Sequence, residues 1–471
     1  MELLSGHLAE DSRALDEILG VTRNYDMTAR TLVVGGRAAR LYFLDGYGKD
    51  EVIERVLSVW LALSPEQLRP VRDMEQFAAR FSTYGETGAE KCIDTIVTSV
   101  LLGKCLLLLE GMAQGLLFDA KSYPARGVEE PGDGKVLRGA HDGFTEVVKK
   151  NAALIRRRIR DPKLVMEQHC VGSRSRTDVV LCYLDDRVDR AALEQIRTRL
   201  DAIDVCSLSM GQESVAEAMH RPQWFNPFPR VRYTERPDAA AASVMEGSIA
   251  LMVDNSPAVM LLPTSFFDFI QETNDYYFPP LVGTYLRFVR FFVFLASLVV
   301  TPLWYLVMMR PEVIPPWLSF IGIAEPNDVP LLLQLLLLEL IVDLLKLASL
   351  NTPDVLSNSF SMLGALILGD FAVRADWLVP EVLVYIAFVA IANFAQPSFE
   401  LGYAIKLSRV VLLILSALFS VWGFVGGLAL MVVLIVTTQP LAGRYLYPLY
   451  PFNWKAMKHL LFRQPIHRDN T

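Results

Sequence analysis

Long runs of apolar residues in the C-terminal part constrain this chain more than any other feature. Residues 281–471 contain 12 Lys and Arg and 11 Asp and Glu, whereas residues 1–280 contain 33 and 41. A single soluble protein with a large core would not separate its charges in this way. Because about 20 mostly apolar residues let a helix cross a bilayer, the sequence predicts an integral membrane protein. An α/β soluble half is expected to precede an α-helical transmembrane domain over residues 271–445.

The transmembrane domain is predicted to hold four to six membrane segments. The segment 409–436 is too long for one upright helix, and the glycines of 422–427 favour a break into a tight hairpin. The segment 329–350 carries charges and 360–373 is short, so the number of crossings stays open. The candidate segments are 288–309, 329–350, 360–373, 378–395 and 409–436.

Charges outside these segments predict the orientation of the chain. The loop 310–328 is acidic, Lys406 and Arg409 stand in a predicted loop, and residues 446–471 form a basic tail. Since positive loops stay in the cytosol, both termini are expected there, and the number of crossings is expected to be even. The aromatic residues of 266–280 are predicted to lie along the membrane surface, with a core helix of the soluble half as the alternative.

The soluble half is predicted to be a duplication. A strand, a glycine turn, a strand, a helix and a hairpin follow one another in each copy, at 32–45, 50–61 and 103–119 and again at 169–185, 192–200 and 247–263. Because the elements recur in the same order, we expect two tandem related cytosolic α/β subdomains, residues 1–145 and 146–270.

Acidic residues within the hydrophobic segments are the candidate functional residues. Glu339 and Asp343 are four apart and share one face of a helix, and Asp343 is three residues from Lys346. Acids inside a membrane are costly unless they face a bundle interior or water. With Asp370 and Asn393 they are candidates for lining a path for cations, as rings of carboxylates do in channels. The alternatives are a structural network, an interfacial helix, and a relay for protons or substrate.

No motif in the chain predicts catalysis. The six histidines and five cysteines lack metal-ligand spacing, no phosphate-binding loop is complete, and no Ser/His/Asp set stands out. The basic run 156–160 lies in a net acidic half without stacking aromatics, so a solvated or membrane-proximal helix face is expected rather than nucleic-acid binding. We therefore expect neither an enzyme nor a cofactor or metal site.

Several segments carry a family resemblance. The motifs resemble the signature of the A subunits of bacterial spore germinant receptors, at 126–131, 138–146, 154–162, 226–238 and 263–269. Together with the hydrophobic half, this resemblance covers nearly the whole chain.

The resemblance implies a function in germination. It implies a multi-pass protein of the inner spore membrane, with its termini on the cytosolic, spore-core side. It also implies a homo-oligomer that works with other germination membrane proteins or receptor subunits, and that forms or assists a channel for monovalent cations, amplifying ion release after germinant sensing. The alternatives are an A subunit of a nutrient receptor and a non-conducting membrane scaffold.

Overall fold

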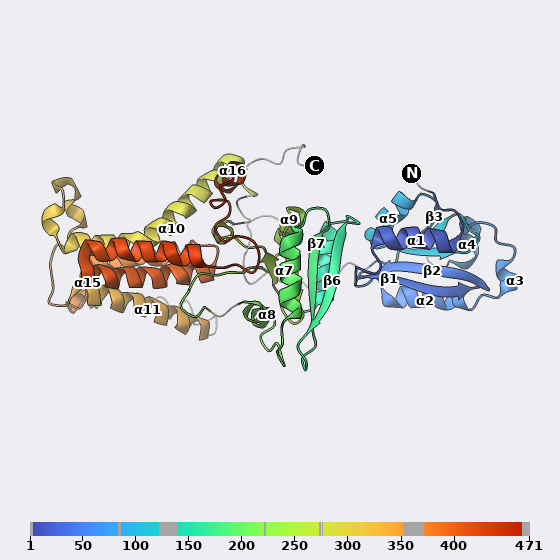
Figure 1. Cartoon of the computed structure of the whole chain (residues 1–471), viewed down its shortest axis with the longest axis horizontal. Helices are drawn as coiled ribbons and strands as arrows, with labels where there is room; N and C mark the ends of the chain where they lie inside the picture. The colour runs from blue at the N-terminus through green and yellow to red at the C-terminus, as the bar shows by residue number, and fades with distance from the viewer. Residues whose placement is uncertain are drawn as a thin grey trace. The chain divides into compact units, whose positions relative to one another are not determined.

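The chain divides into two compact units, which are described separately (Figure 1). The computed structural model describes residues 3–82, 86–121, 140–220, 223–272, 275, 277–351 and 372–463. The α/β unit comprises Met1–Pro222, Val231–Thr264 and Leu441–Gly443, and the helical unit comprises Gln223–Arg230, Ser265–Pro440 and Arg444–Thr471.

The first subdomain of the α/β unit is an antiparallel sheet of order β1-β2-β4-β5-β3 with helices on both faces. Its elements are α1 (Leu8–Leu19), β1 (Met27–Val34), β2 (Arg37–Leu44), α2 (Asp50–Leu61), α3 (Pro65–Leu68), α4 (Met74–Phe81), β3 (Thr87–Glu90), α5 (Ile93–Leu101), β4 (Cys105–Leu109) and β5 (Gly115–Phe118).

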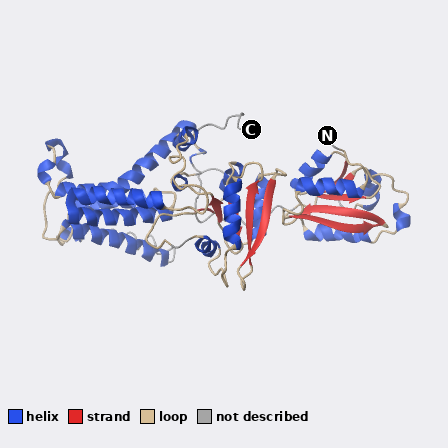
Figure 2. Ribbon diagram, viewed as in Figure 1, coloured by secondary structure: helices blue, strands red, loops and turns tan. Residues whose placement is uncertain are grey.

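The second subdomain repeats this topology in the order β6-β7-β9-β10-β8, so the predicted duplication is present in the fold (Figure 2). Its elements are α6 (Val148–Arg158), β6 (Leu164–Val171), β7 (Thr177–Leu184), α7 (Arg190–Asp201), α8 (Gln212–Met219), β8 (Arg232–Thr234), α9 (Pro237–Met245), β9 (Ile249–Val253) and β10 (Val259–Leu262).

Successive side chains of each strand point to opposite faces of the sheet, and this alternation produces the layers of each subdomain. On β2, Leu41 packs with α2 and α4, whereas Tyr42 faces the other way and packs with α1 and α5. The turn between β1 and β2 is formed by Gly35 and Gly36, whose φ angles of 52° and 76° suit glycine in a two-residue hairpin loop.

Arg156 of α6 makes a buried contact within the α/β unit, which corrects the expected solvated or membrane-proximal face at this residue, whereas Arg157 and Arg160 of the same basic run are exposed as predicted. Arg156 is almost fully buried and forms a two-pronged ion pair with Asp26 of the first subdomain, at 2.9 Å for both hydrogen bonds. It also donates to the Leu164 carbonyl at 3.0 Å. This buried pair ties the two subdomains together.

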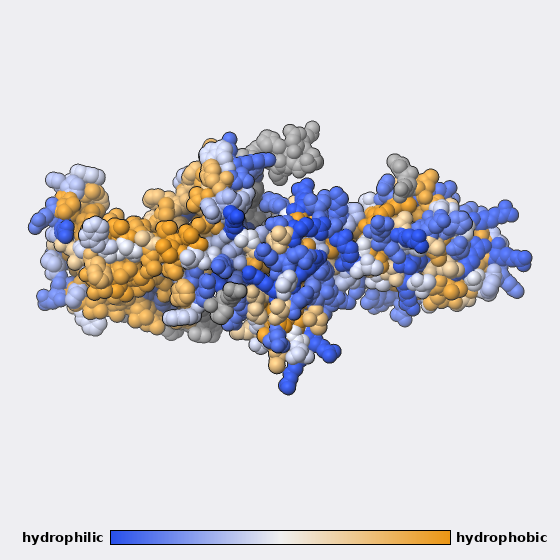
Figure 3. Space-filling model, in the orientation of Figure 1, coloured by the Kyte–Doolittle hydropathy of each residue, from blue (hydrophilic) through white to orange (hydrophobic). Residues whose placement is uncertain are grey.

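The helical unit is built from long apolar helices, over which hydrophobic side chains gather (Figure 3). Its elements are η1 (Phe266–Phe269), α10 (Pro280–Met308), η3 (Pro311–Val313), η4 (Pro316–Ile321), α11 (Leu331–Asn351), α13 (Ala372–Arg374), α14 (Pro380–Phe394), α15 (Phe399–Thr437) and α16 (Trp454–Leu461). Among the described residues, α10 and α15 are long and apolar enough to cross a membrane, and α14 is a shorter apolar helix.

Two apolar clusters fix the directions of these helices. At one level, Phe294 of α10 packs with Leu401 and Leu434, which lie near the two ends of α15. At the other level, Trp304 of α10 packs with Leu413, in the middle of α15, and with the first halves of α11 and α14. The two ends of α15 therefore lie on one side of the bundle.

The predicted hairpin in the last hydrophobic segment is present, and it breaks at Ser420. This residue has φ 56° and ψ −137° and divides α15 into two arms. Gly423 and Gly427 of the second arm pack closely against Leu415 and Leu412 of the first. The break thus lies two residues before the stretch 422–427 in which the sequence predicted it, and the glycines of that stretch permit the two arms to approach.

The aromatic segment 266–280 is not confined to a surface. Phe266 and Phe269 of η1 are buried in the cluster that contains Phe294 and Tyr445. The Phe266 amide donates to the Tyr445 carbonyl at 2.7 Å. The expected surface position is therefore wrong for these rings, and so is the alternative of a core helix in the soluble half, because they belong to the core of the helical unit.

The glycines of the hairpin make the first testable prediction. A Cβ on Gly423 would overlap the Leu415 carbonyl oxygen, whereas a Cβ on Gly426 would meet nothing within 4 Å. Gly423→Ala should therefore destabilise the helical unit by about 1–3 kcal/mol through overpacking, and Gly426→Ala should not. Thermal melting of the full chain in detergent distinguishes them, and equal melting temperatures would contradict the close approach.

Candidate functional site

Charged side chains from α11 and α15 meet halfway along the helical bundle. Arg409 donates to Glu339 Oε1 from Nε at 2.8 Å, and its Nη2 lies 2.7 Å from the same oxygen. Arg409 Nη1 donates to the Ser297 carbonyl of α10 at 2.8 Å. Lys406 Nζ lies 3.3 Å from Glu339 Oε2 and also forms an ion pair with Asp343. These residues form the charge cluster of the bundle.

Helical spacing explains why these four side chains meet. Glu339 and Asp343 are four apart on α11, and Lys406 and Arg409 are three apart on α15, so each pair lies on one face of its helix. The side chains of Glu339, Lys406 and Arg409 are each less than a tenth exposed, whereas that of Asp343 is 34% exposed. A buried charge is tolerated when it is paired and hydrogen-bonded, and this arrangement meets that condition.

Lys346 and Asn393 lie toward one end of the same bundle. The Lys346 ammonium is 4.6 Å from the ring centre of Phe394 and 5.2 Å from that of Tyr403. With the Asn393 amide oriented so that its oxygen faces α11, that oxygen accepts from Lys346 Nζ at 3.0 Å and its nitrogen donates to the Gly402 carbonyl at 3.1 Å. Asn393 thus joins α14 to α11 and α15.

The structure brings together two of the four predicted residues and places a third nearby. Glu339 and Asp343 share one helix face and contact α15, and Asn393 lies beside Lys346. Asp370 lies outside the described residues. The sequence spacing allowed Asp343 to pair with Lys346 on the same helix, and in the structure Asp343 forms an ion pair with Lys406 of α15.

Lys406 and Arg409 require a correction. The sequence interpretation placed them in a loop and used them as evidence of orientation, but both are buried inside α15. The signal that could have corrected this interpretation is the need of Glu339 and Asp343 for positively charged partners. Acids within an apolar helix need cationic partners, and two cations spaced three apart at the start of another apolar run meet that need.

The arrangement neutralises charge within one chain. In the charge cluster, Glu339 and Asp343 contribute two negative charges and Lys406 and Arg409 contribute two positive charges, while Lys346 lies beside the cluster and adds one further positive charge. A structural network of this kind was one of the alternatives that the sequence left open. Among these groups, the partly exposed Asp343 carboxylate is the acid that a neighbouring molecule or ion can reach.

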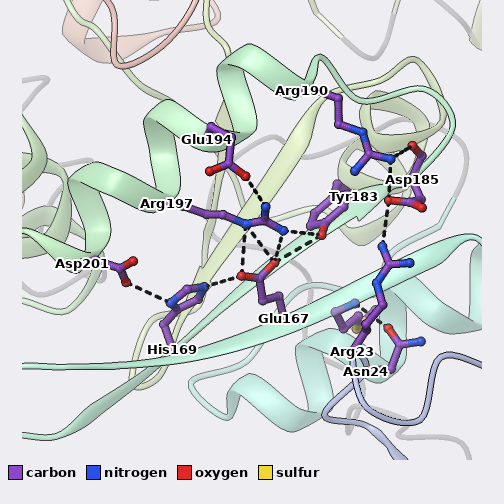
Figure 4. A network of polar contacts seen from close by, with 11 residues as sticks. Arg23, Asn24, Glu167, His169, Tyr183, Asp185, Arg190, Glu194, Arg197 and Asp201 are labelled. Atoms are coloured by element: carbon purple, nitrogen blue, oxygen red, sulfur yellow. Dashed lines mark hydrogen bonds and ion pairs between the residues drawn. The ribbon is translucent and has the colours of Figure 1, made fainter.

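A second polar network lies in the α/β unit, on β6, β7 and α7 (Figure 4). Glu167 accepts from Arg197 Nη2 at 2.6 Å, and Arg197 also donates to the Tyr183 hydroxyl at 2.9 Å. His169 Nε2 lies 3.0 Å from Glu167 Oε1, and its Nδ1 lies 3.4 Å from Asp201. The network fastens α7 onto the sheet.

A cleft of about 450 Å³ adjoins this network. It is lined by residues 21–25 of the first subdomain and by Glu167, Gln168 and Arg197 of the second. Arg23, at its edge, forms an ion pair with Asp185 at 2.8 Å. The charged side chains that line the cleft are thus paired with one another or with neighbours, and none is poised as a nucleophile. Within the described ranges, no group of three or more His, Cys, Asp and Glu residues could hold a metal ion.

The Glu167–His169 pair predicts a dependence of stability on pH. The hydrogen bond from His169, with the Arg197 pair, lowers the pKa of Glu167 to about 2, and the hydrogen bond to Glu167 raises the pKa of His169. The carboxylate therefore stabilises the fold above about pH 4.5 and loses this effect as pH falls toward about 2. The imidazolium stabilises the fold below about pH 6.5 and loses its effect as pH rises through its raised pKa.

The expected result is a small fall in the melting temperature of the full chain between about pH 6 and about pH 8. His169→Gln should remove this fall, because glutamine keeps a hydrogen-bond donor but does not titrate. The effect should stay below about 1 kcal/mol, since the groups are partly exposed. An unchanged pH profile in the variant would exclude His169 as its source.

Comparisons with known proteins agree on one family. The family model described as Bacillus/Clostridium GerA spore germination protein matches residues 13–471. Stage V sporulation protein AF of Bacillus subtilis (strain 168) is 37% identical over 445 residues, covering 94% of this chain and 90% of that protein. Spore germination protein KA of the same organism is 30% identical, covering 85% of this chain and 74% of that protein.

Similarity extends to a solved structure. The N-terminal domain of the A subunit of the Bacillus megaterium spore germinant receptor GerK3 is 25% identical, with a TM-score of 0.44, and it covers 56% of this chain and 98% of that chain. The family model and the two relatives confirm the predicted family resemblance. Within the family, the turn at 34–37 and the ending 447–453 resemble those of stage V sporulation protein AF, and the 37% identity agrees with this resemblance.

Proposed function

This chain belongs to the GerA family of spore germination proteins, and we propose that it acts in the inner spore membrane by forming or assisting an oligomeric cation channel. In this role it amplifies ion release after germinants have been sensed. The observation that carries the proposal is the charge cluster in the middle of an apolar bundle, because charge is retained at such a position at a cost in stability.

The directions of the helices support a membrane orientation with both termini on one side. The chain enters α10 from the side of the bundle on which Phe294 meets Leu401 and Leu434, and it leaves α15 on that same side. An even number of crossings follows if the bundle spans the bilayer. The basic residues after α15, Lys455 and Lys458 among them, favour the cytosolic, spore-core side for that level.

The charge cluster then lies near the middle of the bilayer. Ser297, which accepts from Arg409, is nine residues beyond Phe288, where the apolar run of α10 begins. At 1.5 Å per residue this is about 14 Å, or half of a hydrocarbon core of about 30 Å. Glu339 and Arg409 are thus farthest from water, and their pairing holds α10, α11 and α15 together.

Asp343 is the residue of the charge cluster that an ion or another copy of the chain would contact. Its carboxylate is partly exposed, whereas the Glu339 carboxylate is enclosed. In a homo-oligomer, Asp343 side chains from several copies would supply a ring of carboxylates that attracts monovalent cations. Other germination membrane proteins would then open or stabilise this path.

The test uses spores that carry a single substitution. Asp343→Asn should slow potassium release severalfold after germinant addition, while the amount of protein in the membrane stays unchanged. Asp328→Asn is the matched control, because Asp328 is an exposed acid of the same unit outside the helices. Normal potassium release from Asp343→Asn spores would remove this residue from the ion path.

Two alternatives predict different results. An A subunit of a nutrient receptor predicts that deletion abolishes the response to one nutrient, rather than slowing responses to all. A scaffold, favoured by the neutralisation of charge within one chain, predicts no conductance from the purified protein in liposomes. A monomer in detergent would count against any path built from several copies.

A further inference from the structure

We infer that α16 and the loop before it form a binding surface for anionic lipid headgroups. This inference rests on the proposed insertion of the helical unit into a bilayer. The surface, called the tail surface below, consists of exposed aromatic and basic side chains, namely Tyr447, Tyr450, Phe452, Trp454, Lys455 and Lys458.

The charged side chains of this stretch are all basic. Residues 444–463 contain four Lys and Arg and no Asp or Glu. Large aromatic side chains are interleaved with these cations, and Tyr450, Phe452 and Trp454 are 69%, 62% and 64% exposed. The guanidinium of Arg444 lies 5.6 Å from the ring centre of Tyr450. Several exposed aromatic rings close together favour an environment that is apolar on one side and aqueous on the other.

The position of the tail surface supplies that environment. Arg287, in the first turns of α10, donates to the His459 carbonyl at 2.7 Å and to the Leu460 carbonyl at 3.1 Å, which satisfies the end of α16. The ring of Phe462 contacts that of Phe288 edge-on, with centres 5.7 Å apart. Through these contacts α16 is fixed where the apolar run of α10 begins.

The neighbouring face of α10 continues the same surface toward the hydrocarbon. Tyr285, Phe288 and Phe292 on α10 are exposed, whereas Leu460 of α16 is buried. Aromatic rings favour the headgroup layer of a bilayer, and cations beside them attract anionic lipids. An acidic protein would pair with the lysines but would leave these exposed rings of α10 uncovered. The charge and the continuity with α10 therefore favour a lipid surface.

The experiment measures hydrogen exchange of the full chain in nanodiscs. One set contains phosphatidylcholine alone, and the other contains an equimolar mixture with phosphatidylglycerol. The amides of 447–463 should exchange several-fold more slowly in the mixture. Lys455→Glu combined with Lys458→Glu should abolish this difference, whereas Arg310→Glu, an exposed cation at the other end of α10, should leave it unchanged.

The outcomes separate this inference from the proposed function. Equal exchange in both lipids, with the bundle protected, would overturn the lipid surface while leaving membrane insertion intact. A bundle that is unprotected in both lipids would instead overturn insertion. Should the charge reversal disturb α16 even in phosphatidylcholine, Lys455→Gln with Lys458→Gln replaces it. Slower exchange in the mixture that persists in the neutral variant would overturn recognition of the headgroup charge.

Discussion

Arg409→Leu is expected to destabilise the helical unit by about 3–5 kcal/mol, the usual effect of removing one partner of a buried ion pair. The substitution leaves the enclosed Glu339 carboxylate with Lys406, which already pairs with Asp343. It also removes the hydrogen bond to the Ser297 carbonyl that joins α10 to α15. Thermal melting and the yield of folded full chain in detergent measure the effect.

A double variant distinguishes a lost pair from a lost packing contact. Glu339→Leu with Arg409→Leu removes both charges, and replacing a buried pair by apolar residues is often neutral. We therefore expect the double variant to recover most of the lost stability, and Arg310→Leu, at an exposed position, to melt like the unmodified chain. If the double variant were as unstable as Arg409→Leu, packing rather than charge would explain the loss.

Asp26→Asn is the second substitution with a large expected effect. It nearly keeps the volume of the side chain, but Arg156, which is 1% exposed, remains buried without a counter-charge. The expected loss is about 3 kcal/mol or more, and it falls at the contact between the two subdomains. Urea unfolding of the full chain, followed by hydrogen exchange of β1 and β6, measures it.

The matched control is the surface pair of Lys163 and Asp186 in the same unit. Both side chains are about half exposed, and they lie 2.8 Å apart. Asp186→Asn should therefore change stability by about 0–1 kcal/mol. If Asp26→Asn cost no more than this, water would have to reach Arg156, and the pair would not connect the subdomains.

The elements predicted with most success are those in which a local pattern determines the structure. Residues 50–61 alternate apolar and polar side chains with helical spacing and coincide with α2. Gly35 and Gly36 mark the hairpin turn, and the hairpin at 247–263 turns at Asn255, with φ 61°. In each case the chemistry of a few neighbouring residues suffices.

The interpretations that were wrong all depended on contacts between distant residues. Lys406 and Arg409 resembled loop cations because their partners are some 70 residues away on α11. Arg156 resembled part of a solvated face because its partner Asp26 lies 130 residues before it. Phe266 resembled a surface residue because the sequence does not show that Tyr445 and Phe294 pack around it. Spacing along the chain reveals that a charge needs a partner but not where the partner is.

Residues Leu441–Gly443 follow the long helices in the chain but belong to the α/β unit. Leu441 and Ala442 are almost fully buried in the same apolar cluster as Leu193 and Leu251 of the second subdomain. A ribosome releases these residues only after α10, α11, α14 and α15 have been made. Until then a newly made α/β unit lacks part of its apolar core, so a product truncated before residue 441 would expose apolar surface to proteases.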